Sequence, residues 1–387
     1  MASRSNIEKR MTKAKYKSHG IERNRSYYGC WRKTLETYGY LEWLLQNAGP
    51  IIRYQTAIEL LKNESKKPYL EKKLLSSNLV RFWLENLNPN PDRKTLHGAK
   101  TESYENVMGK LFEFGLKEGQ PIMDSKARPF RRWLKEQIKL SNEGYLPVFY
   151  RTLTAAFLVL TGYSDDEAVK EWVLRRLNTV YTFAKEGSLK EAYVPQTKFP
   201  GFPKGFRKTP LLNPELYPND ELKLPWIHDI NAFLHASFIM EDTNLREKVE
   251  DIVKFVLTPV YQRLHVGYGV VRHQSGRYYA MGWSVHLPAY FESNVSSKDA
   301  GHLLLLLKLL SPSKAAREHP WFKRSIQILS QFKREDGLMS FPRIFLPEKR
   351  FGCWILGHRM ALEENRRAEK AIVCESTFRF LEITSRS

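Results

Sequence analysis

The sequence predicts an all-α protein built from helical hairpins, with a few short strands and one long proline-rich loop. Three observations lead to this fold class. Apolar residues recur at helical spacing along most of the 387 residues. Strand-like patterns are confined to two short stretches, "GYGVV" and "RYYAMGW". The segment 194–226 carries seven prolines and therefore cannot form a regular helix.

The first hairpin is predicted over residues 40–63. Leu41, Leu44 and Leu45 share one helical face, and the helix breaks at Gly49-Pro50. Proline suits the first turn of the helix that follows, where its missing N–H would have no partner. Similar units follow at 103–138 and 149–187. Later helices are expected near Ile227–Met240, Leu245–Leu264, Lys298–Leu310, Trp321–Phe332 and Ala368–Ile383.

The acidic run after Gly162-Tyr163 is interpreted as a helix start. Ser164 and Glu167 have the spacing of a capping box, and acids in a first turn complement the helix dipole. This interpretation is preferred to a metal-diphosphate motif at Asp165 and Asp166.

Composition and charge limit the class of protein. A hydrophobic content of 42% is enough for a full core. The net charge of +20 favours polyanions or a basic soluble surface, and residues 1–26 form a basic arm ahead of a single domain at 27–387. No apolar run is long enough to span a membrane, and no signal peptide is evident, so a cytoplasmic location is expected. The three cysteines are too scattered for a disulfide framework.

One turn resembles a repeat of known proteins. In "WFKRSIQILSQFKREDGLMSFP", an apolar helix is followed by Gln331 and then by Asp336-Gly337. This resembles the repeated turn of the terpenoid cyclase and protein prenyltransferase superfamily. The resemblance implies an α/α toroid, in which about six helical hairpins form a closed double ring around a cavity. The catalytic Asp-x-Asp-Asp element of the cyclases is missing here. Cys353 and His358 have no evident third ligand, so no metal site is expected.

The stretch Gly267–Pro288 is the densest group of candidate site residues. Its glycines argue against a helix, and neither face of an extended strand would be purely apolar. Functional side chains are common on such loops. Tyr279 and His286 are candidates for proton transfer, and Trp283 for stacking. Arg272 and Arg277 would bind an anion, and His273 is a further ligand-binding candidate.

Further candidates lie at helix starts and on the C-terminal helix. Trp226 opens a helix directly after the proline-rich loop and would stack on a ligand, whereas Asp229 is expected to be structural. His97 and Glu105 lie at another helix start, where Glu105 is either a base or a first-turn acid. Glu375 is a third proton-transfer candidate. Its spacing from Arg379 predicts an ion pair on one face of the helix.

These observations predict a toroid with an aromatic and basic cavity that binds an organic, anionic ligand. An enzyme built on this cavity would use acid–base chemistry without a cofactor, because no glycine-rich phosphate loop is present. Other interpretations stay open. One is a nucleic-acid-binding helical protein that uses its basic surface. The others are a polysaccharide-lyase-like enzyme and a non-catalytic scaffold.

Overall fold

The computed structural model describes residues 37–140 and 144–385, so the predicted basic arm, residues 1–26, lies outside the described residues. The chain divides into two compact units, Met1–Trp43 and Leu44–Ser387. The described part of the first unit, residues 37–43, is helical. All that follows concerns the second unit. The predicted domain start at residue 27 stays a prediction.

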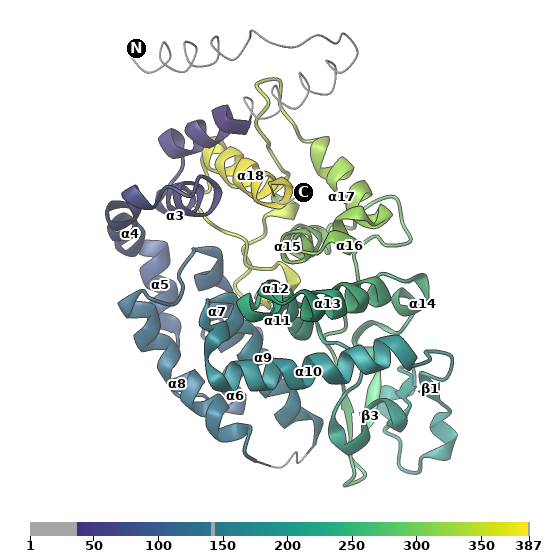
Figure 1. Ribbon diagram of the computed structural model, residues 1–387. Coiled ribbons are helices and arrows are strands. Elements are labelled where there is room, and N and C mark those ends of the chain that lie inside the picture. The colour runs from purple at the N-terminus through teal and green to yellow at the C-terminus, as the bar shows by residue number, and fades with distance from the viewer. Residues whose placement is uncertain (1–36, 141–143, 386–387) are drawn as a thin grey trace, which may run out of the picture. The chain divides into compact units, whose positions relative to one another are not determined.

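The second unit is mostly helical, as the sequence predicted (Figure 1). Its α-helices are α3 (Pro50–Gln55), α4 (Lys67–Ser76), α5 (Asn78–Asn86), α6 (Arg93–Leu96), α7 (Tyr104–Glu113), α8 (Pro121–Gln137), α9 (Tyr145–Leu160), α10 (Glu167–Glu186), α11 (Ile227–His235), α12 (Ser237–Glu241), α13 (Thr243–Val256), α14 (Pro259–Gln262), α15 (Ala300–Leu310), α16 (Lys314–Glu318), α17 (Pro320–Ser330) and α18 (Glu369–Thr384). A π-helical turn, η1 (Thr56–Leu60), continues α3. None of the described helices is long and apolar enough to cross a membrane.

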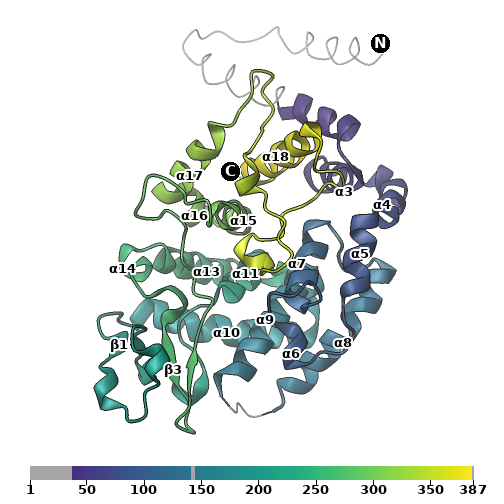
Figure 2. The same cartoon turned by 180° about the vertical axis from the view of Figure 1, so that it is seen from behind.

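Six of these helices contact one another in a closed series. Helix α18 packs on α3 and on α15, α15 packs on α11, α11 on α9, and α9 on α7. The Gln55 side chain donates to the Glu113 carbonyl at 2.8 Å and so links α3 to α7. Figures 1 and 2 both show α18 beside α3, although the two helices are far apart in the sequence, near the start and the end of the second unit. We call these six the central helices.

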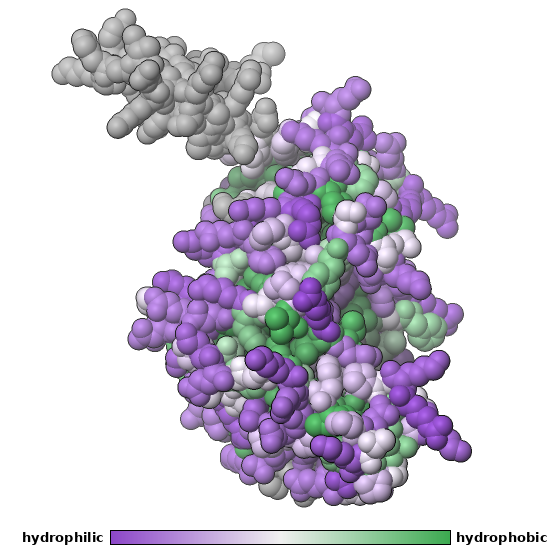
Figure 3. All heavy atoms as spheres, turned by 90° about the vertical axis from the view of Figure 1, so that its right-hand side faces the viewer, coloured by the Kyte–Doolittle hydropathy of each residue, from purple (hydrophilic) through white to green (hydrophobic). Residues whose placement is uncertain are grey.

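The central helices have the sequence character of buried helices. In α9 and α15 nearly every side chain is buried, including those of the run "LLLLLKLL". Helices that are apolar all round are expected in a core, whereas α8, α10, α13 and α17 each bury one face and expose the other. Figure 3 shows a patch of apolar residues among hydrophilic ones on the face of α14 and α17.

A four-stranded sheet joins the proline-rich loop to the stretch predicted as strands. The strands are β1 (Tyr193–Val194), β2 (Leu211–Leu212), β3 (Val270–Arg272) and β4 (Tyr278–Ala280). Their order is β1-β2-β3-β4, and the β2–β3 pair is parallel while its neighbours are antiparallel. Gly269 has φ +86° and lies so close to Pro210 that a Cβ would be 2.3 Å from its carbonyl oxygen. Glycine is therefore required where β3 meets the loop.

Helix α10 begins differently from the prediction. Its N-cap is Asp166 and not Ser164. The Asp166 carboxylate accepts from the N–H groups of Ala168 and Val169. Ser164 instead shares a hydrogen bond with Ser237. The structural interpretation of the two aspartates is confirmed for Asp166, but the capping residue was wrong because one 3-10 turn precedes the helix.

Candidate functional site

Four of the sequence-predicted site residues lie together at the N-terminal ends of α7, α9 and α11. The ring of His97, which precedes α7, is 4.8 Å from the ring of Trp283, centroid to centroid. Phe149 of α9 joins them, at 5.4 Å from His97 and 5.5 Å from Trp226. We define the aromatic–histidine cluster as His97, Glu105, Phe149, Trp226, His228 and Trp283.

Glu105 is the buried acid of this cluster. Its side chain is fully buried, and its Oε1 lies 2.8 Å from His97 Nδ1 and accepts from the Gly98 N–H at 2.9 Å. The imidazole N–H is not aligned for a hydrogen bond at this short distance. A carboxylate held behind an imidazole is nevertheless the arrangement that orients a general base, and such contacts often tighten only when a ligand binds. The His97 side chain is 25% exposed, so a ligand can reach it.

Cys353 places a thiol against the same carboxylate. Burial and the neighbouring Glu105 raise the pKa of Cys353 well above its ordinary range. The group therefore stays a neutral thiol and is not a nucleophile. Cys353 and His358 do not form a metal site, and no set of three His, Cys, Asp or Glu residues in the described ranges can hold a metal ion.

His228 is a functional candidate that the sequence analysis passed over. It lies in the first turn of α11, fully buried, with its ring 5.5 Å from Phe149 and 6.0 Å from Trp283. Burial, together with the smaller effect of the nearby His97, lowers the pKa of His228 to about 3, so the imidazole is neutral at physiological pH. Neither ring nitrogen has a hydrogen-bond partner among residues 37–140 and 144–385.

Asn231 repeats this situation one turn further along α11. Its side chain is buried, and both atoms of its amide also lack a partner within the described chain. Each buried polar atom left unpaired costs about 1–3 kcal/mol. Two such side chains, three residues apart on one helix face, are therefore strong candidates to meet a ligand. The i, i+3 spacing of His228 and Asn231 was visible in the sequence, but their burial was not.

Trp283 is held in a strained backbone conformation. Its φ is +60°, which is unusual for a residue with a bulky side chain. Its carbonyl accepts from the Ile227 N–H at the start of α11, and its neighbour Ser284 pairs with Trp226 in an isolated bridge. Backbone strain of this kind concentrates at functional sites. It also breaks the strand alternation that was expected from Arg277 to Leu287.

Asp229 has the structural role that was predicted for it. Its carboxylate accepts from the Trp226 N–H at 2.9 Å and pairs with the buried Arg176 at 2.8 Å. These contacts fix the position of Trp226 and the direction of α11.

Both ring nitrogens of His286 have hydrogen-bond partners. Nδ1 is 2.6 Å from Ser284 Oγ, and Nε2 is 2.8 Å from the Leu264 carbonyl oxygen. His286 is not a member of the aromatic–histidine cluster, and the proton-transfer role expected for it stays a prediction.

The remaining candidates of that stretch belong to the small sheet. Tyr279 is on β4, and its ring lies 5.8 Å from Tyr145 and 6.4 Å from His273. Arg272 stacks on Phe199 at 5.8 Å, and Arg277 is exposed. Within the described chain, no ring contact or ion pair joins any of these four side chains to His97 or His228.

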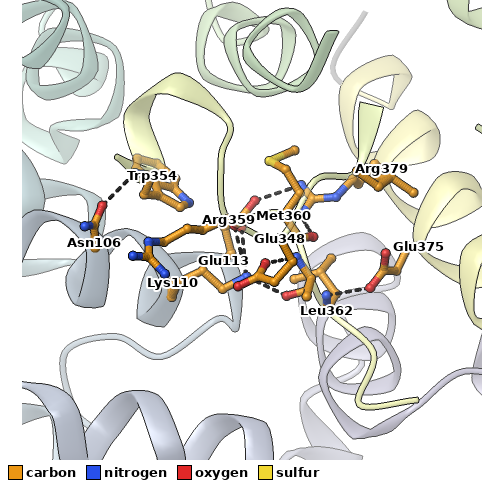
Figure 4. Close-up of polar contacts among 12 residues, drawn as sticks. Asn106, Lys110, Glu113, Glu348, Trp354, Arg359, Met360, Leu362, Glu375 and Arg379 are labelled. Atoms are coloured by element: carbon orange, nitrogen blue, oxygen red, sulfur yellow. Dashed lines mark hydrogen bonds and ion pairs between the residues drawn. The ribbon is translucent and has the colours of Figure 1, made fainter. Parts of the chain in front are cut away.

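Glu375 lies in a second group of buried charges, shown in Figure 4. Its carboxylate accepts from the N–H groups of Leu362 and Glu363 and pairs with Arg366 at 2.9 Å. Arg379 pairs with Glu113 at 2.7 Å and not with Glu375, so the ion pair expected on α18 was wrong. With its oxygens engaged, Glu375 is assigned to the framework and not to proton transfer.

No protein-family model, curated protein or solved structure matches this chain. The resemblance to the terpenoid cyclase and prenyltransferase superfamily therefore stays a prediction.

Proposed function

We propose that the second unit is an α/α toroid whose central helices form the inner ring. The closed series of contacts from α3 through α7, α9, α11, α15 and α18 supports this arrangement. The ends of these helices support it further. His97, Phe149 and His228 lie together at helix starts, whereas residues near the ends of η1, α7, α9, α15 and α18 line one cavity. Parallel inner helices of a toroid have their N-terminal ends on one side of the ring and their C-terminal ends on the other, which is the distribution seen for these two groups of residues.

We infer that the aromatic–histidine cluster binds an organic, anionic ligand and that His97 acts on it as a general base. The observation that carries this proposal is the pair of buried side chains, His228 and Asn231, whose polar atoms lack partners in the described chain. A ligand would supply those partners. Three helix starts meet at the cluster, and their positive dipole ends favour a negative group.

The proposed roles follow from position. Trp283 and Phe149 offer aromatic faces to the body of the ligand. Neutral His228 donates from one ring nitrogen and accepts at the other, and Asn231 adds an amide. His97 Nε2 takes a proton from the ligand, and the Glu105 carboxylate stabilises the imidazolium that forms. The same imidazolium then returns the proton to the product, so no cofactor is required.

Native mass spectrometry of the purified protein tests the proposal. We expect a retained ligand mass on the natural chain, and its loss in Trp283→Ala and His228→Phe. His265→Gln is the matched control, because His265 is an exposed histidine of the neighbouring loop. Thermal unfolding checks that each variant is folded. Equal retention by all four proteins, or a ligand that remains after His228→Phe, would contradict the assignment.

The proton-transfer step has its own test once the ligand is known. The glutamine of His97→Gln can still form hydrogen bonds but cannot accept a proton at neutral pH. Turnover should therefore fall by about 10²–10⁴-fold while ligand retention persists. Retained turnover would leave a binding protein without catalysis by His97.

A further inference from the structure

A second site lies at the opposite ends of the central helices. A cavity of about 380 Å³ is lined by residues near the ends of η1, α7, α9, α15 and α18. Its size falls within the range of small-molecule sites. None of the members of the aromatic–histidine cluster lines it. Helices α7 and α9 run between the two sites: α7 has Glu105 in its first turn and Phe112 near its end, and α9 has Phe149 near its start and Leu160 at its end.

The floor of the cavity is a buried ion pair. Lys308 Nζ lies 2.9 Å from Glu382 Oε1, and the two side chains are 5% and 11% exposed. The Lys308 ammonium also lies 4.7 Å from the centroid of the Phe112 ring. The second oxygen of this carboxylate, Glu382 Oε2, has no hydrogen-bond partner in the part of the chain described. A buried carboxylate oxygen without a donor is a site for an ammonium group.

The rim of the cavity has an excess of positive charge. Lys62 and Lys117 both pair with one carboxylate, Glu59, at 3.6 and 2.8 Å. One carboxylate cannot neutralise two ammonium groups, so the rim has positive charge to offer a carboxylate. The two lysine side chains are 74% and 41% exposed and can turn toward a ligand. Glu59 and Leu60 reach the cavity from the π-helical turn η1, a geometry often found at functional sites.

Apolar side chains make up the rest of the cavity lining. Phe112 and Phe378 contribute aromatic surface, and the aliphatic residues of the lining are Leu60, Leu116 and Leu160. Arg379 of α18 pairs with Glu113 of α7, and Lys110 of α7 donates to the carbonyls of Arg359 and Ala361, in the loop that precedes α18 (Figure 4). These contacts fix α7 and α18, so the positions of Phe112 and Glu382 are set before a ligand arrives.

We propose that this cavity binds a zwitterion with an apolar body, of the chemical class of an apolar α-amino acid. Its ammonium group bonds to Glu382 Oε2, its carboxylate lies at Lys62 and Lys117, and its side chain lies against Phe112 and Phe378. An ammonium group over these rings also gains a cation–π contact. This site does not depend on the function proposed for the aromatic–histidine cluster.

Three probes with the same phenyl group separate the contributions of the two charges. We would titrate the full chain with L-phenylalanine, with phenethylamine, which lacks the carboxylate, and with 3-phenylpropanoate, which lacks the amine, using isothermal calorimetry. The zwitterion should bind at least about tenfold more tightly than either analogue, because each loses one charged hydrogen bond. Absence of phenylalanine binding, or equal affinity for all three probes, would overturn the proposal.

Variants test the proposed ammonium contact and the proposed carboxylate contacts separately. Glu382→Gln should weaken phenylalanine and phenethylamine by about tenfold and leave phenylpropanoate unchanged. Lys62→Ala with Lys117→Ala should weaken phenylalanine and phenylpropanoate by about threefold to tenfold and leave phenethylamine unchanged. The rim variants are at exposed positions, so they keep the test valid if Glu382→Gln unfolds. Lys190→Ala, an exposed lysine at a different surface pocket, is the control. The opposite pattern of losses would contradict the assigned orientation of the ligand.

Discussion

Glu363 binds the backbone at the start of helix α3, although the two positions are more than three hundred residues apart in the sequence. Its Oε1 accepts from the Gly49 N–H at 2.6 Å. The carboxylate lies so close that a Cβ on residue 49 would be 2.5 Å from Oε2. Burial raises the pKa of Glu363 to about 7, the nearby Glu375 and Glu364 add to the rise, and Gly49 N–H and Arg53 oppose it.

This pKa implies a pH dependence of stability with a defined sign. A carboxyl whose pKa is higher in the folded chain favours folding in its neutral form, so it destabilises the fold as pH rises from about 4.5 to 7. A rise from 4.5 to about 7 corresponds to at most about 3.4 kcal/mol, at 1.36 kcal/mol for each pKa unit. Because the side chain is only partly buried, we expect about half of that.

Glu363→Gln isolates the effect, since the amide oxygen can still accept from Gly49. Urea unfolding from pH 5 to pH 8 should show the variant gaining about 1–2 kcal/mol on the natural chain across this interval. Glu364→Gln is the contrast. Glu364 accepts from Ser77 and from the start of α5, which lowers its pKa, so this variant should be less stable by an amount that is constant over the same interval. A difference between Glu363→Gln and the natural chain that does not vary with pH would refute the reasoning.

Four further outcomes are expected. Trp354→Ala should cost about 3–5 kcal/mol in chemical denaturation, because its fully buried ring fills the space between α7 and α9, and a cost below 1 kcal/mol would contradict this packing. Gly109→Ala should cost about 1–3 kcal/mol, since the added Cβ would be 2.2 Å from the Trp354 ring, and a neutral effect would show that the ring can move. Asp166→Ala should cost about 1 kcal/mol and more than Ser164→Ala, and the reverse order would restore the predicted cap. Deletion of residues 1–26 should abolish retention on a heparin column if the basic arm binds polyanions, whereas unchanged retention would place the polyanion-binding surface within residues 27–387.

The helical class and most element positions followed from periodicity alone. The helix break at Gly49-Pro50, the buried run of α15 and the two short strands were all predicted within a few residues. Short corrections came from local geometry. The helix predicted from Ile227 to Met240 is divided at Ala236, and the one from Leu245 to Leu264 is divided at Thr258.

The candidate site was predicted in part, for a physical reason. His97, Glu105, Trp226 and Trp283 were selected as polar or aromatic residues at helix starts and loops, and they do lie together. His286 and Glu375 were selected by the same chemistry, but their hydrogen-bonding atoms are taken by groups that no sequence pattern announces, such as the carbonyl of Leu264 and the N–H of Leu362. Composition identifies which side chains can do chemistry, and only tertiary contacts decide which of them are still available.

Helix α7 shows most clearly why the rest was hidden. Its sequence, "YENVMGKLFE", reads as a helix with a polar face, yet Glu105, Asn106, Lys110 and Glu113 are all buried. Three of these side chains have partners more than two hundred residues later: the Trp354 N–H donates to Asn106, Lys110 donates to the carbonyls of Arg359 and Ala361, and Arg379 pairs with Glu113 (Figure 4). A buried polar or charged side chain without a partner destabilises the fold more than the same side chain exposed to water. The burial of α7 therefore depends on these partners from the C-terminal part of the chain. Glu105, which lies against the proposed base, and Phe112, which lines the second cavity, therefore lie at the two ends of one helix whose position depends on these distant partners.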